Sequence, residues 1–336
     1  ELRFWGRAAS SYGIYNSMQP DPRNEAPVAN WLSIYNPGID SLAFVIEIYD
    51  QSGARMDNIR INSLPPGGRT DVALGHPHGQ TTGIYRIIPE HERLPHGAYL
   101  TRYSPQQNVG FDFAFTLGAK KGLRDSGAVP ASTMGPSANW AEIANISGDD
   151  VTVSLEVFSR DGILTYEEIL NIAAFSQQHI YLNSYLGDST VGFFSLRTLS
   201  PQDSNPRLLV QSMHYSIREN QSATGSWAYA SQAESEQKAA DYPINDEEGA
   251  MALPINTFYN APNWLKVLAD GVTSISVELR IFDSAGKEIR TAFRQFTLNG
   301  SRDIALHEIV GINFTGVVLV SPIEPGHRVI AELIRV

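Results

Sequence analysis

The sequence predicts an all-β fold built from three tandem antiparallel β-sandwich modules. The first observation is an Asn-Trp pair that occurs three times, at 30–31, 139–140 and 263–264, each time before an alternating apolar run. The second is constant spacing: the Trp of each Asn-Trp pair is followed after 18 positions by an aromatic residue, after 22 by a glycine and after 52 by another glycine. Such self-similarity at a fixed period indicates a modular array. The residues at these offsets are Tyr49, Phe158 and Phe282; Gly53, Gly162 and Gly286; and Gly83, Gly192 and Gly316.

Within each repeat the apolar residues alternate with period two, which is typical of β-strands. The clearest strands are expected at 42–49, 151–158 and 275–282. One face of each is wholly aliphatic, whereas the other carries Glu47, Glu156 or Arg280, as in antiparallel sheets with one buried side. Turn residues follow at once and favour hairpins. Turn signals every 8–12 residues or so, without a helical stretch, indicate a β-sandwich of immunoglobulin-like size.

The module boundaries come from an aromatic residue that precedes each Asn-Trp pair. Phe4 lies 27 residues before Trp31, and Phe113 lies 27 before Trp140. This equality predicts equivalent first strands at 2–4, 111–115 and 226–229. The predicted modules are residues 1–106, 107–220 and 221–336, the last with an acidic insertion at 234–248.

The repeated Trp is not expected in the sandwich core. Ala141 and Ile143 are the apolar alternates of the second copy, so Trp140 shares a face with Glu142. Two interpretations stay open. The Trp residues cap the open end or outer sheet of their own sandwich, or they pack at the joint between consecutive modules.

Aromatic residues also line two of the predicted first strands. Phe111, Phe113 and Phe115 share one strand face, and Trp227 and Tyr229 share another. Such a stripe belongs to a core, or, if exposed, it stacks on sugar rings or on another subunit. The predicted interaction residues are therefore Trp31, Trp140, Trp264, Phe111, Phe113, Phe115, Trp227 and Tyr229.

Composition restricts the possible partners. The 336 residues carry a formal net charge of −11 and no cysteine, which disfavours a nucleic-acid surface, disulfides and thiolate chemistry. No apolar run approaches the ~18 residues that suggest a membrane-spanning helix. The sequence starts with Glu1, so we expect an exported product whose signal has been removed, located outside the cell, on its surface or in the periplasm.

Reactive motifs are not evident in the sequence. Weak metal candidates are Asp246, Glu247 and Glu248 in the acidic insertion and the loop residues His76 and His78, but none has regular ligand spacing. We therefore predict no catalytic residue, no resident metal and no cofactor.

The combined pattern resembles the immunoglobulin-like β-sandwich repeats of exported bacterial surface proteins. It consists of a strand that opens with Trp, an alternating run that ends in aromatic-x-x-x-Gly, a middle strand, and a Gly before the final apolar strand. The segment 122–132 also resembles the linker between such repeats. The resemblance implies export and a scaffold or surface role.

We therefore expect a non-enzymatic extracellular or cell-surface structural protein, a subunit of a filament, surface layer or envelope assembly. Its partners would be other protein chains or further copies of itself. The alternative is a carbohydrate-binding or adhesin array that uses exposed aromatic strands, and an enzyme without a recognisable motif is the third hypothesis.

Overall fold

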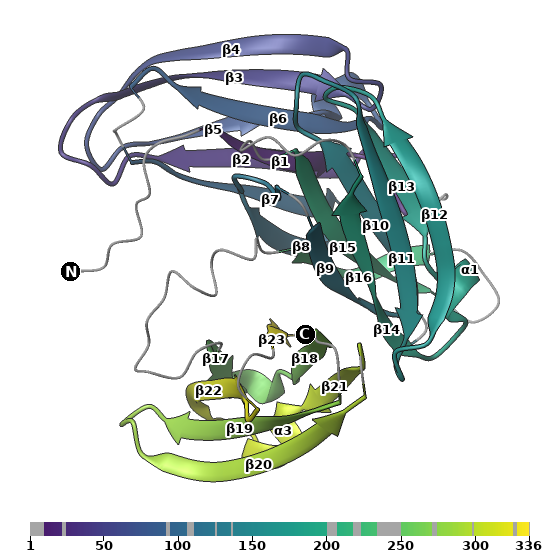
Figure 1. The fold of residues 1–336 in the computed structure, drawn as a ribbon. Coiled ribbons are helices and arrows are strands. Elements are labelled where there is room, and N and C mark those ends of the chain that lie inside the picture. Colours follow the sequence, from purple (N-terminus) through teal and green to yellow (C-terminus); the bar gives the residue numbers. More distant parts are fainter. Residues whose placement is uncertain are drawn as a thin grey trace.

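A computed structural model describes most of the chain. The described residues are 10–21, 25–91, 95–105, 111–124, 126–135, 137–199, 207–217, 223–233, 250–270, 274–297, 299–324 and 328–335. Figure 1 shows strands throughout, arranged in sheets that follow one another from the N-terminal to the C-terminal part of the chain. The predicted all-β antiparallel class is confirmed.

Two four-stranded sheets form the first sheet pair. One contains, in spatial order, β1 (Ser11–Asn16), β6 (Thr82–Pro89), β3 (Leu42–Asp50) and β4 (Arg55–Leu64). The other contains β5 (Arg69–Ala73), β2 (Ala29–Tyr35), β7 (Gly97–Pro105) and β8 (Phe111–Gly118). One buried apolar cluster draws residues from both sheets, among them Leu32 of β2 and Ile46 of β3, so the sheets pack face to face.

The second sheet pair repeats this order. One sheet contains β12 (Leu164–Ile172), β11 (Val151–Ser159), β14 (Val191–Thr198) and β9 (Ser126–Ser132). The other contains β13 (Gln177–Tyr181), β10 (Ser137–Asn145), β15 (Leu208–Ile217) and β16 (Ala223–Gln232). Their shared core includes Ile143 and Leu155.

The third sheet pair has one strand fewer among the described residues. Its four-stranded sheet contains β17 (Met251–Asn256), β22 (Thr315–Pro322), β19 (Ile275–Asp283) and β20 (Glu288–Phe296). The facing sheet contains β21 (Ser301–Ala305), β18 (Asn263–Asp270) and β23 (Arg328–Arg335). Within the described part of the chain, the position that β8 and β16 take beside β7 and β15 has no counterpart beside β23.

Among the described residues, helical structure is limited to short segments of three to five residues between strands. These are η1 (His76–His78), α1 (Asn183–Leu186), η2 (Phe258–Asn260) and α3 (Leu306–Val310). Three of them, η1, α1 and α3, follow the short strand of each sheet pair, which adds to the internal repetition.

The predicted burial of the alternating strands is confirmed. The inward apolar positions Phe44, Ile46 and Ile48 of β3 and their counterparts on β11 and β19 are at most 4% exposed, whereas Glu47, Glu156 and Arg280 on the opposite faces are partly accessible. The final repeated glycine also has a physical reason. A Cβ at Gly83, Gly192 or Gly316 would lie within 2.3 Å of the carbonyl oxygen of the repeated aromatic residue on the neighbouring strand. Only glycine allows the strands to approach this closely.

One strand assignment in the sequence analysis was wrong. The strands predicted to open the second and third modules pair with the preceding sheet pair instead, β8 with β7 and β16 with β15. Constant spacing to the next Trp identifies equivalent strands, but it does not tell which edge those strands join. The predicted boundaries near 106 and 220 therefore cut between strands that are hydrogen-bonded in one sheet. The remaining predicted first strand, at 2–4, lies outside the described residues.

Candidate functional site

The three repeated Trp residues occupy equivalent positions on the central strands β2, β10 and β18. Trp31 and Trp264 are each 38% exposed, with His76 and His307 as their ring neighbours at 5.4 and 5.3 Å between centroids. Trp140 instead packs against the apolar cluster where the first and second sheet pairs meet. Each of the two interpretations left open by the sequence therefore describes part of the molecule. Trp140 packs at the joint between two sheet pairs, whereas Trp31 lies partly exposed on the outer sheet of its own pair.

The Asn that precedes each Trp has a role that the sequence analysis missed. Asn30, Asn139 and Asn263 are 0% exposed, and each Oδ1 accepts a hydrogen bond from the backbone N–H of residue 16, 132 or 256 in the opposite sheet. Their Nδ2 groups donate mainly to carbonyl oxygens, for example that of Met213. A buried amide with several partners links the two sheets at one end of each pair.

The aromatic strand residues that can be located are not free surface. Phe113 is 4% exposed and its ring lies 5.9 Å from that of Tyr215 on β15 of the second sheet pair. Phe115 is partly buried beside it. Tyr229 stacks on His214 with 4.2 Å between centroids. The side chains of Phe111 and Trp227 lie outside the described set.

The metal candidates do not form a described site. His76 Nδ1 accepts the backbone N–H of Asn30 at 3.0 Å, which occupies its inner nitrogen, and His78 is exposed two residues further on. Asp246, Glu247 and Glu248 lie outside the described residues. Over the part of the chain that is described, no group of three or more His, Asp or Glu side chains is arranged to hold a metal ion.

The first junction, defined here as the contact between the first and second sheet pairs, contains a buried ion pair. Arg102 of β7 and Glu142 of β10 have side chains 0% and 1% exposed, with 3.6 Å between Nη1 and Oε2. Asn16 Nδ2 donates to Glu142 Oε1 at 2.6 Å, and Gln211 Nε2 donates to Oε2. Arg102 Nη2 donates to Tyr215 Oη at 3.0 Å. The charges are thus held by hydrogen bonds from both sheet pairs.

Electrostatics keep this pair ionised. Burial alone would raise the pKa of Glu142, but Arg102 and His179 together with the two amide donors outweigh burial and lower that pKa. Burial also raises the pKa of Tyr215 to about 12, so its hydroxyl stays protonated beside the guanidinium.

Two apolar clusters lie on either side of the ion pair and complete the first junction. One contains Ile14, Tyr49 and Ile84 from the first pair with Ile146 and Leu209 from the second. The other contains Val28, Phe113, Ala138, Met213 and Tyr215. The Phe175 ring stacks on that of Tyr49 at 4.5 Å, and Phe175 holds a positive φ of 54° to do so. A left-handed aromatic residue is strained and persists where its contacts compensate.

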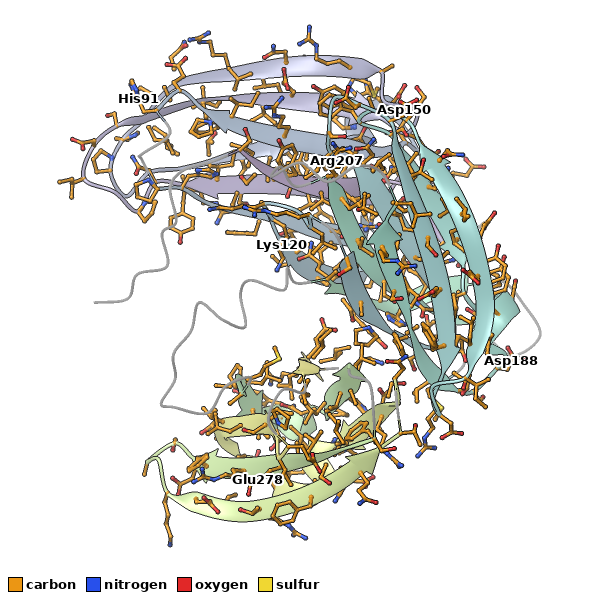
Figure 2. The ribbon with its side chains drawn as sticks, in the orientation of Figure 1. His91, Lys120, Asp150, Asp188, Arg207 and Glu278 are labelled. Atoms are coloured by element: carbon orange, nitrogen blue, oxygen red, sulfur yellow. The ribbon has the colours of Figure 1, made fainter. Side chains whose placement is uncertain are left out.

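The connection between β8 and β9 also ties the two sheet pairs together. Lys120 N donates to Tyr12 O and Tyr12 N donates to Lys120 O, at 2.8 and 2.7 Å. Leu123 N donates to Leu208 O, and Arg207 N donates to Leu123 O. Figure 2 labels Lys120 and Arg207 in the region where the two sheet pairs adjoin. The connection is therefore fixed to β1 on one side and to β15 on the other.

The second junction, between the second and third sheet pairs, is built around Lys266 of β18. Its side chain is 3% exposed and Nζ lies 3.1 Å from Asp303 Oδ2 on the neighbouring strand β21. The ammonium lies 5.9 Å from the ring centroid of Tyr229 on β16. Burial would lower the pKa of Lys266, but Tyr229, Asp303 and Glu332 outweigh it and raise that pKa. Burial and the nearby Lys266 charge hold the pKa of His214 well below its ordinary value, so His214 is neutral.

The two junctions use equivalent residues. Arg102 and His214 both pair across the sheet with the repeated Asn, and Phe115 and Tyr229 pair with them on the next strand. Glu142 and Lys266 both lie two residues after the repeated Trp. Each following sheet pair therefore presents the same outer face to the same end of the preceding pair.

A backbone hydrogen bond repeats in the same way. Gln177 N donates to Gln51 O at 3.1 Å, and Ser301 N donates to Arg160 O at 3.0 Å. Gln51 and Arg160 both lie two residues after the repeated aromatic, and Gln177 and Ser301 both begin the short strand that pairs with the Trp strand. The mode of docking, and not only the fold of each unit, is therefore repeated along the chain.

Comparison with protein-family models, with curated proteins and with solved structures finds no match for this chain. Among the described residues, the longest helical segments are too short to cross a lipid bilayer. The junctions described above are therefore the basis for a functional hypothesis.

Proposed function

We propose that the chain is a structural protein of three tandem immunoglobulin-like β-sandwich modules, exported and used outside the cell, on its surface or in the periplasm. It works by contact with other protein chains as a subunit of a filament, surface layer or envelope assembly. The observation that carries the proposal is the repeated junction, in which residues on the outer face of the Trp strand of one unit pack against the end of the unit before it.

Burial at the first junction supports a load-bearing or spacing role. The ion pair is desolvated, and breaking such a pair by removing one partner typically costs about 3–5 kcal/mol. Apolar clusters lie on both sides of it. Units joined in this way keep a fixed mutual orientation, which a spacer or scaffold requires and a flexible chain of independent binding modules does not.

Binding to a carbohydrate through the aromatic strands has less support. Phe113 and Phe115 face the second sheet pair and Tyr229 faces His214, so these rings are already in contact with protein. Trp31 and Tyr35 remain as partly exposed rings on the outer face of β2, each 38% exposed. A glycan-binding hypothesis would use this face or the exposed rings of Trp264, Phe258, Tyr259 and Phe293 in the third sheet pair.

The test is the mass of the native particle. Material extracted from its source under mild conditions would be crosslinked and its mass compared with the 37.0 kDa of the chain. We expect a larger particle whose contacts bury at least ~1,000 Å² in total. A chain that stays monomeric in native extracts, with no crosslinked partner, would remove the assembly proposal, and binding of glycans to the Trp31 face would then be measured.

A further inference from the structure

We infer that the chain assembles head to tail with further copies of itself, through a third instance of the junction that it already forms twice internally. In this contact the outer face of β2 and β5 in the first sheet pair of one copy closes the end of the third sheet pair of another. The inference rests on the proposed assembly role and names the partner as a second copy of this chain.

The first sheet pair has the face that the second and third pairs use for docking. Ser33 lies two residues after Trp31, in the position of Glu142 and Lys266. Asp71 pairs with Ser33 across the sheet, as His179 pairs with Glu142 and Asp303 with Lys266. Among the described residues, no other sheet pair covers this face. The Asp71 side chain is 42% exposed.

The turn before this face also repeats. Arg69 begins β5 as Gln177 begins β13 and Ser301 begins β21, and the residue two positions earlier has a positive φ in all three cases, 69° at Gly67, 54° at Phe175 and 52° at Asn299. Gln177 and Ser301 use their backbone N–H groups to hold the preceding sheet pair. The backbone of Arg69 has the same local shape and lies on the exposed edge strand β5.

The third sheet pair has an end equivalent to the ends of the first and second pairs, against which the following pair docks. Arg335 pairs with Asn263 across β18 and β23, in the position of Arg102 and His214. It is exposed and donates from Nη2 to the carbonyl oxygen of Phe258 at 3.0 Å. Phe258 is 42% exposed and the adjoining Tyr259 is 93% exposed. The equivalent end of the first pair carries Val28 at 0%, because the second pair covers it.

Charge and the backbone acceptor complete the match. Ser33 takes the position of Glu142, so the anion that Arg335 would meet is the neighbouring Asp71, which also pairs with Arg69 at 2.8 Å between Nη2 and Oδ1. The acceptor equivalent to Gln51 and Arg160 is Ser284, which lies exposed in the turn between β19 and β20. The docking face and the receiving end therefore carry an opposite charge and a backbone donor and acceptor at the positions that the internal junctions use.

The strand order at the receiving end also bears on the contact. The edge of β23 has no strand in the place of β8 or β16 among the described residues. Residues 1–9 lie outside the described part of the chain, yet their sequence holds Phe4 27 residues before Trp31, as Phe113 of β8 lies 27 before Trp140. The following copy thus carries a sequence segment at the spacing of the strand that the junction uses.

Contacts between two different surfaces of the same chain do not close on themselves as a two-fold dimer does. They produce rings or open filaments, depending on the rotation between copies. The product would be a filament or ring in which consecutive sheet pairs are related in the same way between copies as within one copy.

A disulfide experiment tests the contact directly, since the chain has no cysteine of its own. The variant combines Arg69→Cys with Ser284→Cys, the equivalents of the residues joined by the two internal backbone hydrogen bonds. The matched control combines Gln51→Cys with Gln177→Cys, whose backbone N···O distance is 3.1 Å. Under oxidation we expect a ladder of reducible multimers for the first variant and a reducible monomer with altered mobility for the control.

Sedimentation of charge variants gives an independent readout. Arg335→Glu blocks the receiving end and Asp71→Lys blocks the docking face, so each variant alone should stay at 37.0 kDa. Their equimolar mixture should assemble again, because the unchanged end of one variant meets the unchanged face of the other and the two reversed charges also attract each other. Asp57→Lys, an exposed change on β4 away from both surfaces, should behave as wild type and assemble further with concentration.

The outcomes separate the inference from the proposed function. A monomeric wild type at all concentrations, with no ladder from Arg69→Cys and Ser284→Cys, overturns head-to-tail self-assembly. If native extracts nevertheless contain a large particle, the assembly role stands and its partner is a different chain. If native extracts also contain only monomer, both the inference and the proposed function fall.

Discussion

The two internal junctions dock in the same way but bury different chemistry. In the first, the cation comes from the preceding sheet pair and the anion from the following one, Arg102 and Glu142. In the second, Lys266 and its partner Asp303 both come from the following pair. The preceding pair contributes the neutral His214 and the ring of Tyr229. The ion pair therefore spans the first junction, whereas the ion pair at the second junction lies within the third sheet pair.

This difference has an energetic consequence. If the first junction opened within a folded chain, Arg102 and Glu142 would lose each other, and the apolar clusters beside them would be exposed. If the second opened, Lys266 would keep Asp303, and no described apolar cluster that spans it would be lost. We expect the first and second sheet pairs to unfold as one cooperative unit and the third to separate more easily.

The largest expected effect is at the first junction. Glu142→Gln keeps the shape of the side chain but leaves Arg102 as an unpaired buried charge, so the free energy of unfolding should fall by about 3–5 kcal/mol. Calorimetry should show the shared transition of the first and second sheet pairs moving down or splitting.

Glu156→Gln is the matched control for this change. Glu156 is a partly exposed glutamate on β11, on the face away from the core. We expect a change of at most about 1 kcal/mol there. Equal effects of the two substitutions would contradict the special role of the buried pair.

A smaller effect is expected at the second junction. Lys266→Gln removes the partner of Asp303, whose side chain is 19% exposed and can be reached by water. The loss should be about 1.5–3 kcal/mol, the typical value of a hydrogen bond to a charged group, and it should appear in the transition of the third sheet pair. Lys287→Gln in the exposed turn after β19 serves as control. A shift of the first transition instead would show that the third pair is coupled more tightly than its contacts indicate.

The sequence predicted the strands well because their information is local. Alternation with period two identified the buried face of β3, β11 and β19, and the turn glycines Gly53, Gly162 and Gly286 all have the positive φ that favours glycine. Edge assignment failed for β8 and β16, because strand pairing is decided by neighbours in space and not by distance to the next Trp.

The junction residues could be predicted only in part. Asn30, Asn139 and Asn263 share the core face of their strands with aliphatic residues, and a polar residue repeated on a core face signals a buried hydrogen-bond hub. Glu142 gave no such signal, since an acid on an outer face is normally solvated. Glu142 is buried because the first sheet pair packs against it. That contact depends on the docking of two units and not on either sequence segment alone.

The pH dependence of stability tests both junctions together. The Glu142 carboxyl has a lowered pKa in the folded chain, so its contribution is present above its ordinary value of 4.5 and is lost as pH falls through the folded value. His214 is held neutral, so the unfolded chain takes up its proton below about 6.5 while the folded chain does not. Both effects lower stability on acidification.

Stability should also fall at alkaline pH, where the unfolded chain loses protons that the folded chain keeps. Tyr215, with its pKa raised to about 12, and Lys266, with a raised pKa, keep their protons in the folded chain above 10 and 10.5, where the unfolded chain loses them. Melting temperature measured against pH should therefore have a plateau between about 7 and 10. His76 and His96, whose pKa values are also lowered by burial, contribute to the decline that begins near 6.5, so His214→Asn should reduce that decline without changing the one below 4.5. An unchanged profile would contradict the contribution of His214.

The smallest expected effect concerns the edge of the second junction. Thr297 Oγ1 donates to the carbonyl oxygen of Asp161 at 3.0 Å, next to the backbone bond from Ser301 N to Arg160 O. Thr297→Val removes this exposed hydrogen bond at nearly constant volume and should cost about 0.5–1.5 kcal/mol. The equivalent bond from Gln177 N belongs to the first junction, where it lies beside the stacked Tyr49 and Phe175 rings. Thr297→Val should therefore leave that bond unaffected.

Amide hydrogen exchange can follow these two backbone bonds separately. We expect the Ser301 amide to exchange faster than that of Gln177 in the wild type, although both residues are 4% exposed, because opening of the second junction breaks fewer contacts. Thr297→Val should accelerate exchange at Ser301 alone. Thr291→Val, which removes a hydroxyl bond to Glu288 within β20, is the control and should leave both amides unchanged. Acceleration at Gln177 as well would mean that the two junctions open together, and the distinction drawn between them would fail.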